Sequence, residues 1–135
     1  MIYLDANIFL YAILNKEEEG EKARNLIKKI QKGEIIAGTS ALSFDEVFWS
    51  VKKHRDFDKA LKATKAFLEI PNLTFFDVND EIIWSAYNFA EKYRLDPRDS
   101  IHLACALNHG IFTIVSEDDD FDRVKEIKRK GLIKF

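Results

Sequence analysis

The sequence has little cysteine, proline or glycine, no long apolar run and almost no net charge, and each shortage excludes a class of protein. A single cysteine, Cys105, cannot form an internal disulfide, so the chain is no disulfide scaffold. Two prolines and five glycines exclude collagen-like repeats, and the glycines never fall in the phosphate-loop pattern G-x-x-x-x-G-K-[S/T]. No run approaches the roughly 20 apolar residues of a membrane-spanning helix. We therefore expect a soluble, cytoplasmic protein without a membrane segment.

The residues that are abundant predict one packed domain. Hydrophobic residues make up 47% of the chain and include 11 phenylalanines, while 33% of the residues are charged. A chain of 135 residues with this composition can bury a core without a structural metal, so we expect a single domain over residues 1–135. The apolar start, Met1 to Leu14, contains Asp5 and lacks a basic segment and a small-residue cleavage site. We interpret it as part of the fold rather than as a signal peptide.

Short apolar segments predict buried strands. The clearest are Ile2–Leu4 and Ile111–Val115, which do not alternate with polar residues and are followed by acidic residues. Weaker strand candidates are Ile35–Ala37, Leu73–Phe76 and Leu132–Ile133.

Between these segments, apolar residues repeat with helical spacing. The pattern is clearest over Ala23–Ile30 and Ile82–Tyr93 and broader over Ala41–Val51 and Phe57–Leu68. Gly33 and Gly110 stand where helix ends commonly take a left-handed conformation. Helices that alternate with short buried strands predict an α/β domain with a mainly parallel sheet, because parallel strands need crossover helices. In such sheets, ligands bind where the carboxyl ends of the strands meet.

Acidic side chains follow both of the clearest strands. Asp5 comes directly after Ile2–Leu4, and five acids lie in Ser116–Asp122, just after Val115. Each has an ordinary alternative role, because an aspartate commonly caps the N-terminus of a helix and an acidic loop is usually solvated.

Two further acidic candidates lie on predicted helices. Asp99 falls in the first turn of a helix that Asp96 and Pro97 begin, where an acid also favours the helix dipole. Glu46 lies within the helix predicted over Ala41–Val51. Helical periodicity does not single it out, because Asp45 lies closer to the apolar face, and periodicity alone places both residues on the surface.

Taken together, these acids predict a metal site. Parallel strands bring their carboxyl ends together, so acids at two strand ends and two helix starts can converge on one cleft. Two carboxylates about 4 Å apart repel by roughly 4 kcal/mol at an effective dielectric constant near 20, so a cluster of four is protonated or holds a cation. Carboxylate oxygens suit Mg²⁺ or Mn²⁺, which commonly bridge to phosphate. A site of this kind hydrolyses phosphodiester bonds.

Three stretches carry a family resemblance: Leu4–Tyr11, Leu95–Leu107 and Thr113–Phe121. The most specific parts are Asp99-Ser100-Ile101-His102-Leu103-Ala104-Cys105-Ala106 and Ser116-Glu117-Asp118-Asp119-Asp120-Phe121. Over nearly its full length the chain resembles PIN domains, and more closely the toxin ribonucleases of VapBC toxin–antitoxin pairs. This resemblance implies a PIN-like three-layer fold, with a mainly parallel central sheet of about five strands flanked by helices.

The resemblance also implies the role of particular residues. The residues that correspond to the family's catalytic and metal-binding quartet are Asp5, Glu46, Asp99 and Asp118, and the accessory polar groups are Asn7, Ser116 and Asp120. Glu46 is preferred to Asp45 on register alone, because Ser43 and Ser40 stand three and six residues before it. Ser116 stands where the family more often has threonine, and it keeps the hydroxyl.

The implied activity is Mg²⁺- or Mn²⁺-dependent endonucleolytic hydrolysis of RNA. The implied partners are the RNA substrate, a small VapB-type antitoxin and a second copy of the chain, and exposed aromatics such as Trp49, Trp84 or Tyr87 could serve this homodimer. The basic clusters available to RNA are Lys52, Lys53 and Arg55, and Lys125, Lys128, Arg129 and Lys130, although solvated helix ends are an ordinary alternative for each.

Several alternatives remain open at this point. The chain could be a stand-alone RNA-processing nuclease, or a module of the same fold that binds RNA or protein without cleavage. A haloacid-dehalogenase-type phosphatase also has an aspartate after its first strand, but it normally has a second aspartate where this chain has Asn7. We interpret His102 and Cys105 as structural, because the chain has no Cys/His spacing typical of zinc sites and Cys105 lies among apolar residues.

Overall fold

The strands form one fully parallel sheet in the order β3-β2-β1-β4-β5. The computed structural model describes all residues 1–135. The strands are β1 (Ile2–Leu4), β2 (Ala37–Ser40), β3 (Leu73–Phe76), β4 (Thr113–Val115) and β5 (Lys128–Lys130). The central strand β1 pairs with β2 on one side and with β4 on the other, so the ends of β1 and β4 lie next to each other. The predicted α/β fold with a parallel sheet of about five strands is confirmed.

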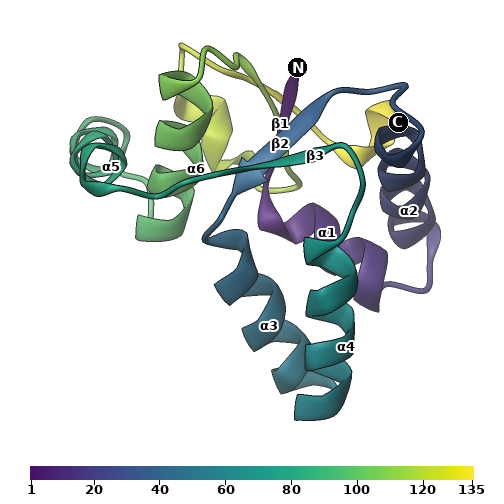
Figure 1. The fold of residues 1–135 in the computed structure, drawn as a ribbon. Coiled ribbons are helices and arrows are strands. Elements are labelled where there is room, and N and C mark those ends of the chain that lie inside the picture. The colour runs from purple at the N-terminus through teal and green to yellow at the C-terminus, as the bar shows by residue number, and fades with distance from the viewer.

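Six α-helices flank this sheet, as Figure 1 shows. They are α1 (Ala6–Leu14), α2 (Glu18–Gln31), α3 (Ser43–His54), α4 (Phe57–Leu68), α5 (Asp80–Tyr93) and α6 (Pro97–Asn108). Two short 3-10 helices, η1 (Asp119–Arg123) and η2 (Leu132–Lys134), lie near the C-terminus. Asp96 and Pro97 begin α6 as predicted, and Gly33 and Gly110 both have positive φ angles, as expected of residues at helix ends. No helix is long and apolar enough to span a membrane.

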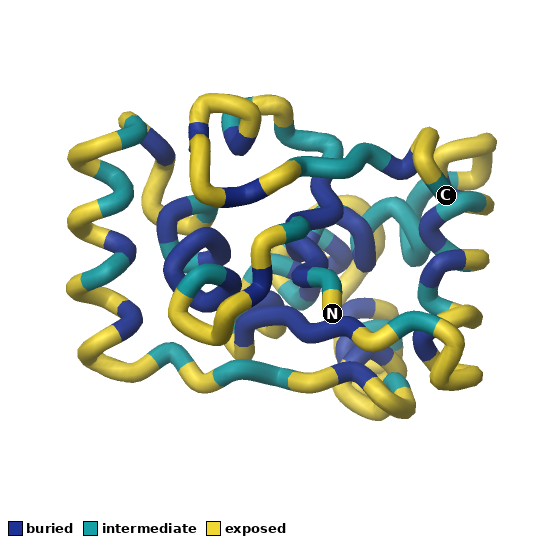
Figure 2. The backbone as a smooth tube through the Cα atoms, turned by 90° about the horizontal axis from the view of Figure 1, so that it is seen from above, coloured by how far each residue is buried: buried dark blue, intermediate teal, exposed yellow.

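Two hydrophobic cores lie on opposite faces of the sheet, because neighbouring residues of a strand point to opposite faces. Leu4 packs in the core that α1, α2, α3 and α4 cover, whereas Tyr3 packs in the core beneath α5 and α6. In Figure 2 the buried residues gather at the centre of the molecule, while the outer helices bury one side only. The fold is therefore the three-layer arrangement that the resemblance implied.

Two strand predictions need correction. Leu132–Ile133 is not a strand but part of η2, in which Leu132 is buried and Ile133 is 81% exposed. The fifth strand is Lys128–Lys130 instead, an edge strand whose three basic residues give no apolar signal. The predicted strand Ile35–Ala37 shares only Ala37 with β2, because the buried part of this segment is the small, mostly polar run that follows.

Candidate active site

Asp5 lies at the carboxyl end of the central strand and is almost completely buried. Its backbone N–H donates to the Val115 carbonyl oxygen (3.1 Å), which ties the end of β1 to the end of β4. Its carboxylate also accepts a long hydrogen bond of 3.4 Å from the Asn7 backbone N–H, so Asp5 is the N-cap of α1 as well. The capping role and a position in an acidic cluster therefore coexist in this residue.

Glu46 reaches the same region from the first turn of α3. The start of this helix is held in place by buried hydroxyl groups, since Thr39 Oγ1 donates to the Leu4 carbonyl oxygen (2.7 Å) and lies 2.8 Å from Ser43 Oγ. The Glu46 side chain is 15% exposed and turns inward. The neighbouring Asp45 side chain is 55% exposed and pairs with Arg98 at the surface (3.3 Å). The structure thus brings Glu46, not Asp45, to the acidic cluster.

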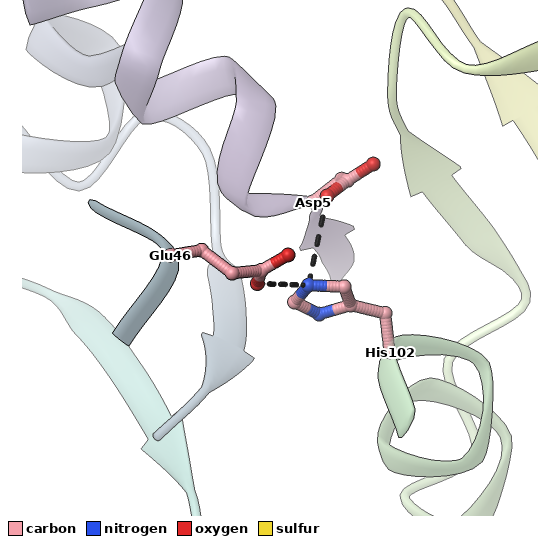
Figure 3. Close-up of side chains that lie close together, drawn as sticks. All are labelled: Asp5, Glu46 and His102. Carbon is pink, nitrogen blue, oxygen red and sulfur yellow. Dashed lines mark hydrogen bonds and ion pairs between the residues drawn. The ribbon is translucent and has the colours of Figure 1, made fainter. Parts of the chain in front are cut away.

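His102 of α6 lies between Asp5 and Glu46, as Figure 3 shows. Its Nε2 is 2.7 Å from Glu46 Oε2 and 3.6 Å from Asp5 Oδ1, while its Nδ1 is 2.6 Å from Tyr3 Oη. The imidazole is fully buried. Asp5, Glu46 and His102 therefore form one compact group, whose oxygen and nitrogen atoms lie within 4.8 Å of one another.

A second compact group consists of Asp99, Asp118 and Asp120, whose carboxylate oxygens also lie within 4.8 Å of one another. Asp99 is in the first turn of α6, while Asp118 and Asp120 are at the start of η1. The Asp118 carboxylate accepts a hydrogen bond from the Asp120 backbone N–H (2.9 Å), which orders this acidic turn. All three side chains are partly buried rather than freely solvated.

Ser116 links the two groups. Its hydroxyl donates to Asp5 Oδ2 (2.6 Å) and accepts from the Asp118 backbone N–H (3.0 Å) and from Asn7 Nδ2 (3.3 Å). The amide oxygen of Asn7, Oδ1, is buried and has no hydrogen-bond partner. A buried acceptor without a partner is costly, so this oxygen indicates a place for a cation or a bound water beside the acids.

The acids perturb one another's ionisation. Burial, the hydrogen bond that protonated Asp99 shares with Asp118 and the nearby charge of Asp5 raise the pKa of Asp99 to about 7. Burial also raises the pKa of Asp5, although the His102 charge and the hydrogen bond from Ser116 act in the opposite direction. The cluster therefore resists carrying its full negative charge, and a cation would relieve this repulsion.

The pKa of His102 is the balance of opposing effects. Burial lowers it, but the hydrogen bond to Glu46 and the charges of Asp5 and Glu46 outweigh burial and raise the pKa above 6.5. Burial raises the pKa of Tyr3 well above 10, so its side chain remains a neutral phenol. The ring of His102 thus lies between the neutral hydroxyl of Tyr3 and the side chain of Glu46.

The residues present fit a hard divalent cation. Four carboxylates, from the end of β1, α3, α6 and the segment after β4, lie in two neighbouring groups that Ser116 links, and carboxylate oxygens select Mg²⁺ or Mn²⁺ over softer metals. The unpartnered oxygen of Asn7 adds a neutral acceptor at the edge of the cluster. The cluster suits no zinc site, since it contains no cysteine and both ring nitrogens of its one histidine, His102, already contact protein groups.

The sequence predicts a structural role for His102 and does not place this residue among the acids. One local signal was available, because His102 follows Asp99 by three residues and so shares its side of the helix.

Among the basic residues suggested for RNA binding, Arg129 already forms an ion pair within the protein. Its guanidinium donates to both carboxylate oxygens of Asp122 (2.9 and 3.1 Å). Lys53 lies over the exposed ring of Trp49, at 5.0 Å from the ring centroid.

Solved structures resemble this fold closely in spite of low sequence identity. VapBC2 from Rickettsia felis, bound to a DNA fragment from its promoter, has a TM-score of 0.76 at 18% identity, over 97% of this chain and 98% of that one. VapC20 from Mycobacterium tuberculosis, described as a toxin that cleaves the sarcin–ricin loop, has a TM-score of 0.75 at 14% identity, over 93% and 95%. FitAcB from Neisseria gonorrhoeae gives 0.72 at 15% identity, over the whole of both chains.

A comparison with curated protein sequences finds no match. A comparison with protein families matches residues 2–127 to the PIN domain. This match spans the sheet through β4, all six α-helices and both acidic groups. The chain therefore belongs to the PIN-domain family.

Proposed function

We propose that this protein is a metal-dependent endoribonuclease and the toxin of a toxin–antitoxin pair. The observation that carries the proposal is the convergence of Asp5, Glu46, Asp99 and Asp118 at the carboxyl ends of β1 and β4. Membership of the PIN family favours a nuclease over the phosphatase alternative. The similarity to toxins of toxin–antitoxin complexes supports the more specific assignment.

In this proposal the four carboxylates hold Mg²⁺ or Mn²⁺, and Asp120, Asn7 and Ser116 support them. When bound, the cation would activate water, position the scissile phosphate and neutralise the leaving oxygen. Ser116 fixes Asp5 through its hydroxyl and the turn at Asp118 through its acceptor oxygen, so both acids are ordered before substrate arrives. The buried sheet beneath Asp5 keeps bulk water from one side of the cluster.

The test is cleavage of labelled single-stranded and stem-loop RNAs by purified protein with Mg²⁺ or Mn²⁺. We expect cleavage to require the metal, to stop with EDTA and to fall at least about 100-fold in Asp5→Asn and Asp99→Asn, because each removes a cation ligand. Asp58→Asn is the matched control, since Asp58 is an exposed acid on α4. Equal cleavage by all variants would contradict the proposal, and RNA binding without cleavage would support the non-cleaving module.

The expected partners are tested separately. A small protein encoded beside this chain should co-purify with it and inhibit cleavage if the chain is a toxin, whereas full activity without such a protein favours a stand-alone RNA-processing nuclease. Light scattering of the purified protein tests the expected homodimer. Trp84 and Tyr87 on α5 are both more than half exposed and offer one apolar surface for it, and Trp49 on α3 offers another.

A further inference from the structure

His102 joins three elements that lie far apart in the sequence. Its Nε2 contacts Glu46 of α3, 56 residues away, and its Nδ1 contacts Tyr3 of β1, 99 residues away. The ring packs edge-on against Tyr3, with 5.6 Å between the ring centroids. The imidazole is fully buried, so no solvent molecule competes for either nitrogen. Both ring nitrogens are therefore committed to protein partners.

The chemistry of these partners fixes where the protons lie. As a metal ligand Glu46 is a carboxylate, which only accepts hydrogen bonds, so its 2.7 Å contact with His102 requires a proton on Nε2. In the neutral ring, Nδ1 then has the lone pair, and the phenol of Tyr3 donates to it across 2.6 Å. In the charged ring, both nitrogens donate. In either state Nε2 carries hydrogen and has no lone pair for a metal.

We propose that His102 is a positioning residue that holds the Glu46 carboxylate in place, with Tyr3 fixing the orientation of its ring, and that it is not a metal ligand. This inference rests on the proposed metal-dependent function in one respect, because it gives Glu46 a cation to bind. The 3.6 Å separation between Nε2 and Asp5 Oδ1 places the same N–H beside the second acid, where its positive end offsets part of the repulsion between the two carboxylates.

Glu46 needs such support more than Asp5 and Asp118 do. Asp5 is held by Ser116 and by the start of α1, and Asp118 belongs to an ordered turn. The glutamate has a longer, more flexible side chain, and its bond to His102 is its only side-chain hydrogen bond. A ligand that is ordered before the metal arrives binds it more tightly, because less conformational freedom is lost on binding.

The first experiment locates the proton and requires no enzymatic activity. Long-range ¹H–¹⁵N spectra of protein labelled at histidine should show His102 protonated at Nε2, both without metal and with saturating Mg²⁺. With Mn²⁺, pulsed electron paramagnetic resonance should show no directly bonded ¹⁵N. Loss of the Nε2 proton on addition of Mg²⁺, or a directly bonded nitrogen, would make His102 a ligand and overturn the proposal.

The second experiment measures Mn²⁺ affinity by calorimetry in matched variants. His102→Leu removes the donor, and we expect binding to weaken by about 10- to 100-fold, the range typical of residues that orient a metal ligand. His102→Gln places an amide N–H near the position of Nε2 and should restore most of the affinity. His54→Leu, at an exposed histidine of α3, is the control and should bind as the wild type does. Wild-type affinity in folded His102→Leu contradicts the proposal, as does no recovery in folded His102→Gln.

Tyr3→Phe provides a test that keeps the size and packing of the buried ring. We expect weaker Mn²⁺ binding than in wild type, with the neutral His102 ring no longer held in one tautomer in the ¹H–¹⁵N spectrum. Tyr87→Phe, on the exposed face of α5, is the matched control. An unchanged tautomer and unchanged affinity in Tyr3→Phe would remove Tyr3 from the proposal. Absence of RNA cleavage by wild-type protein would overturn the proposed ribonuclease and leave these spectroscopic results intact.

Discussion

Ionised Asp99 destabilises the folded protein. Its pKa is raised from 3.8 to about 7, so between these values the folded protein binds more protons than the unfolded chain. The contribution of Asp99 to the free energy of unfolding therefore falls as the pH rises from about 4 to about 7, and this destabilisation reaches its full value above pH 7. We predict that Asp99→Asn raises the free energy of unfolding at pH 8 by about 1–2 kcal/mol. This gain is smaller than the full pKa shift implies, because solvent screens the charge of a partly exposed group.

Urea denaturation in EDTA at pH 8 and pH 5 measures this effect. The gain from Asp99→Asn should shrink at pH 5, because the wild-type carboxyl is already largely protonated there in the folded state. Asp58→Asn should show no such gain, since that acid is exposed in the first turn of α4. Destabilisation by Asp99→Asn at pH 8 would mean that the ionised side chain has a structural role in the metal-free protein.

The same residue makes metal binding depend on pH. A cation that binds Asp99 must displace its proton, because only the ionised carboxylate is a ligand. With a pKa of about 7, we predict that affinity for Mg²⁺ is nearly constant above pH 7.5 and falls by about tenfold for each pH unit below 6.5. Calorimetry in two buffers of different ionisation enthalpy would detect the released proton. Affinity that does not change between pH 6 and pH 8 would exclude Asp99 from the ligand set.

At the scale of elements, the ring of Phe76 on β3 packs over Gly38 of β2 and leaves no room there for a side chain. A Cβ atom on Gly38 would lie 2.4 Å from Cε2 of Phe76, whose ring is itself stacked on His109 with 4.0 Å between the ring centroids. We predict that Gly38→Ala lowers the free energy of unfolding by about 1–3 kcal/mol, because the ring has little room to move. A double-mutant cycle with Phe76→Leu measures the coupling, and additive losses would show that the clash is not the cause.

Elements with a local signal were predictable from sequence, and those fixed by tertiary contacts were not. The helices α2, α4 and α5 follow apolar periodicity, and β1 follows an apolar run. The strand β5 consists of Lys128, Arg129 and Lys130 and exists because it pairs with the edge of β4. Arg129 is stabilised there by Asp122, a contact that charge alone does not reveal in sequence. Edge strands of this composition are the expected failure of pattern-based prediction.

Among the acidic residues too, some positions were predictable from local sequence and others depended on tertiary contacts. Asp5 and the acids after β4 were predictable as neighbours, because carboxyl ends of parallel strands meet. Glu46 was separated from Asp45 only by resemblance, since both lie in the same turn of α3 and periodicity favoured Asp45. The Glu46 side chain points inward, where it forms a hydrogen bond with His102 of another helix. The catalytic roles of the quartet stay predictions until the variants are measured.

At the scale of the whole molecule, the candidate site is assembled from segments spread along the chain. It combines the end of β1, α3, α6 and the turn after β4, so only the folded protein can present all four acids to one cation. A ligand that binds the folded state alone raises the free energy of unfolding by RT ln(1 + [L]/Kd), about 2.7 kcal/mol at a hundred times Kd. Metal binding should therefore report on the integrity of the complete fold.

We predict that saturating Mg²⁺ or Mn²⁺ raises the Tm by on the order of 5–10 °C, as expected for a few kcal/mol in a domain of this size. Differential scanning calorimetry with sodium chloride at equal ionic strength separates specific binding from screening of the acids. The shift should be largely lost in Asp5→Asn, which removes the most buried carboxylate, and retained in Asp58→Asn. An equal shift in sodium chloride would show that the acids only need screening, and it would argue against a specific cation at this site.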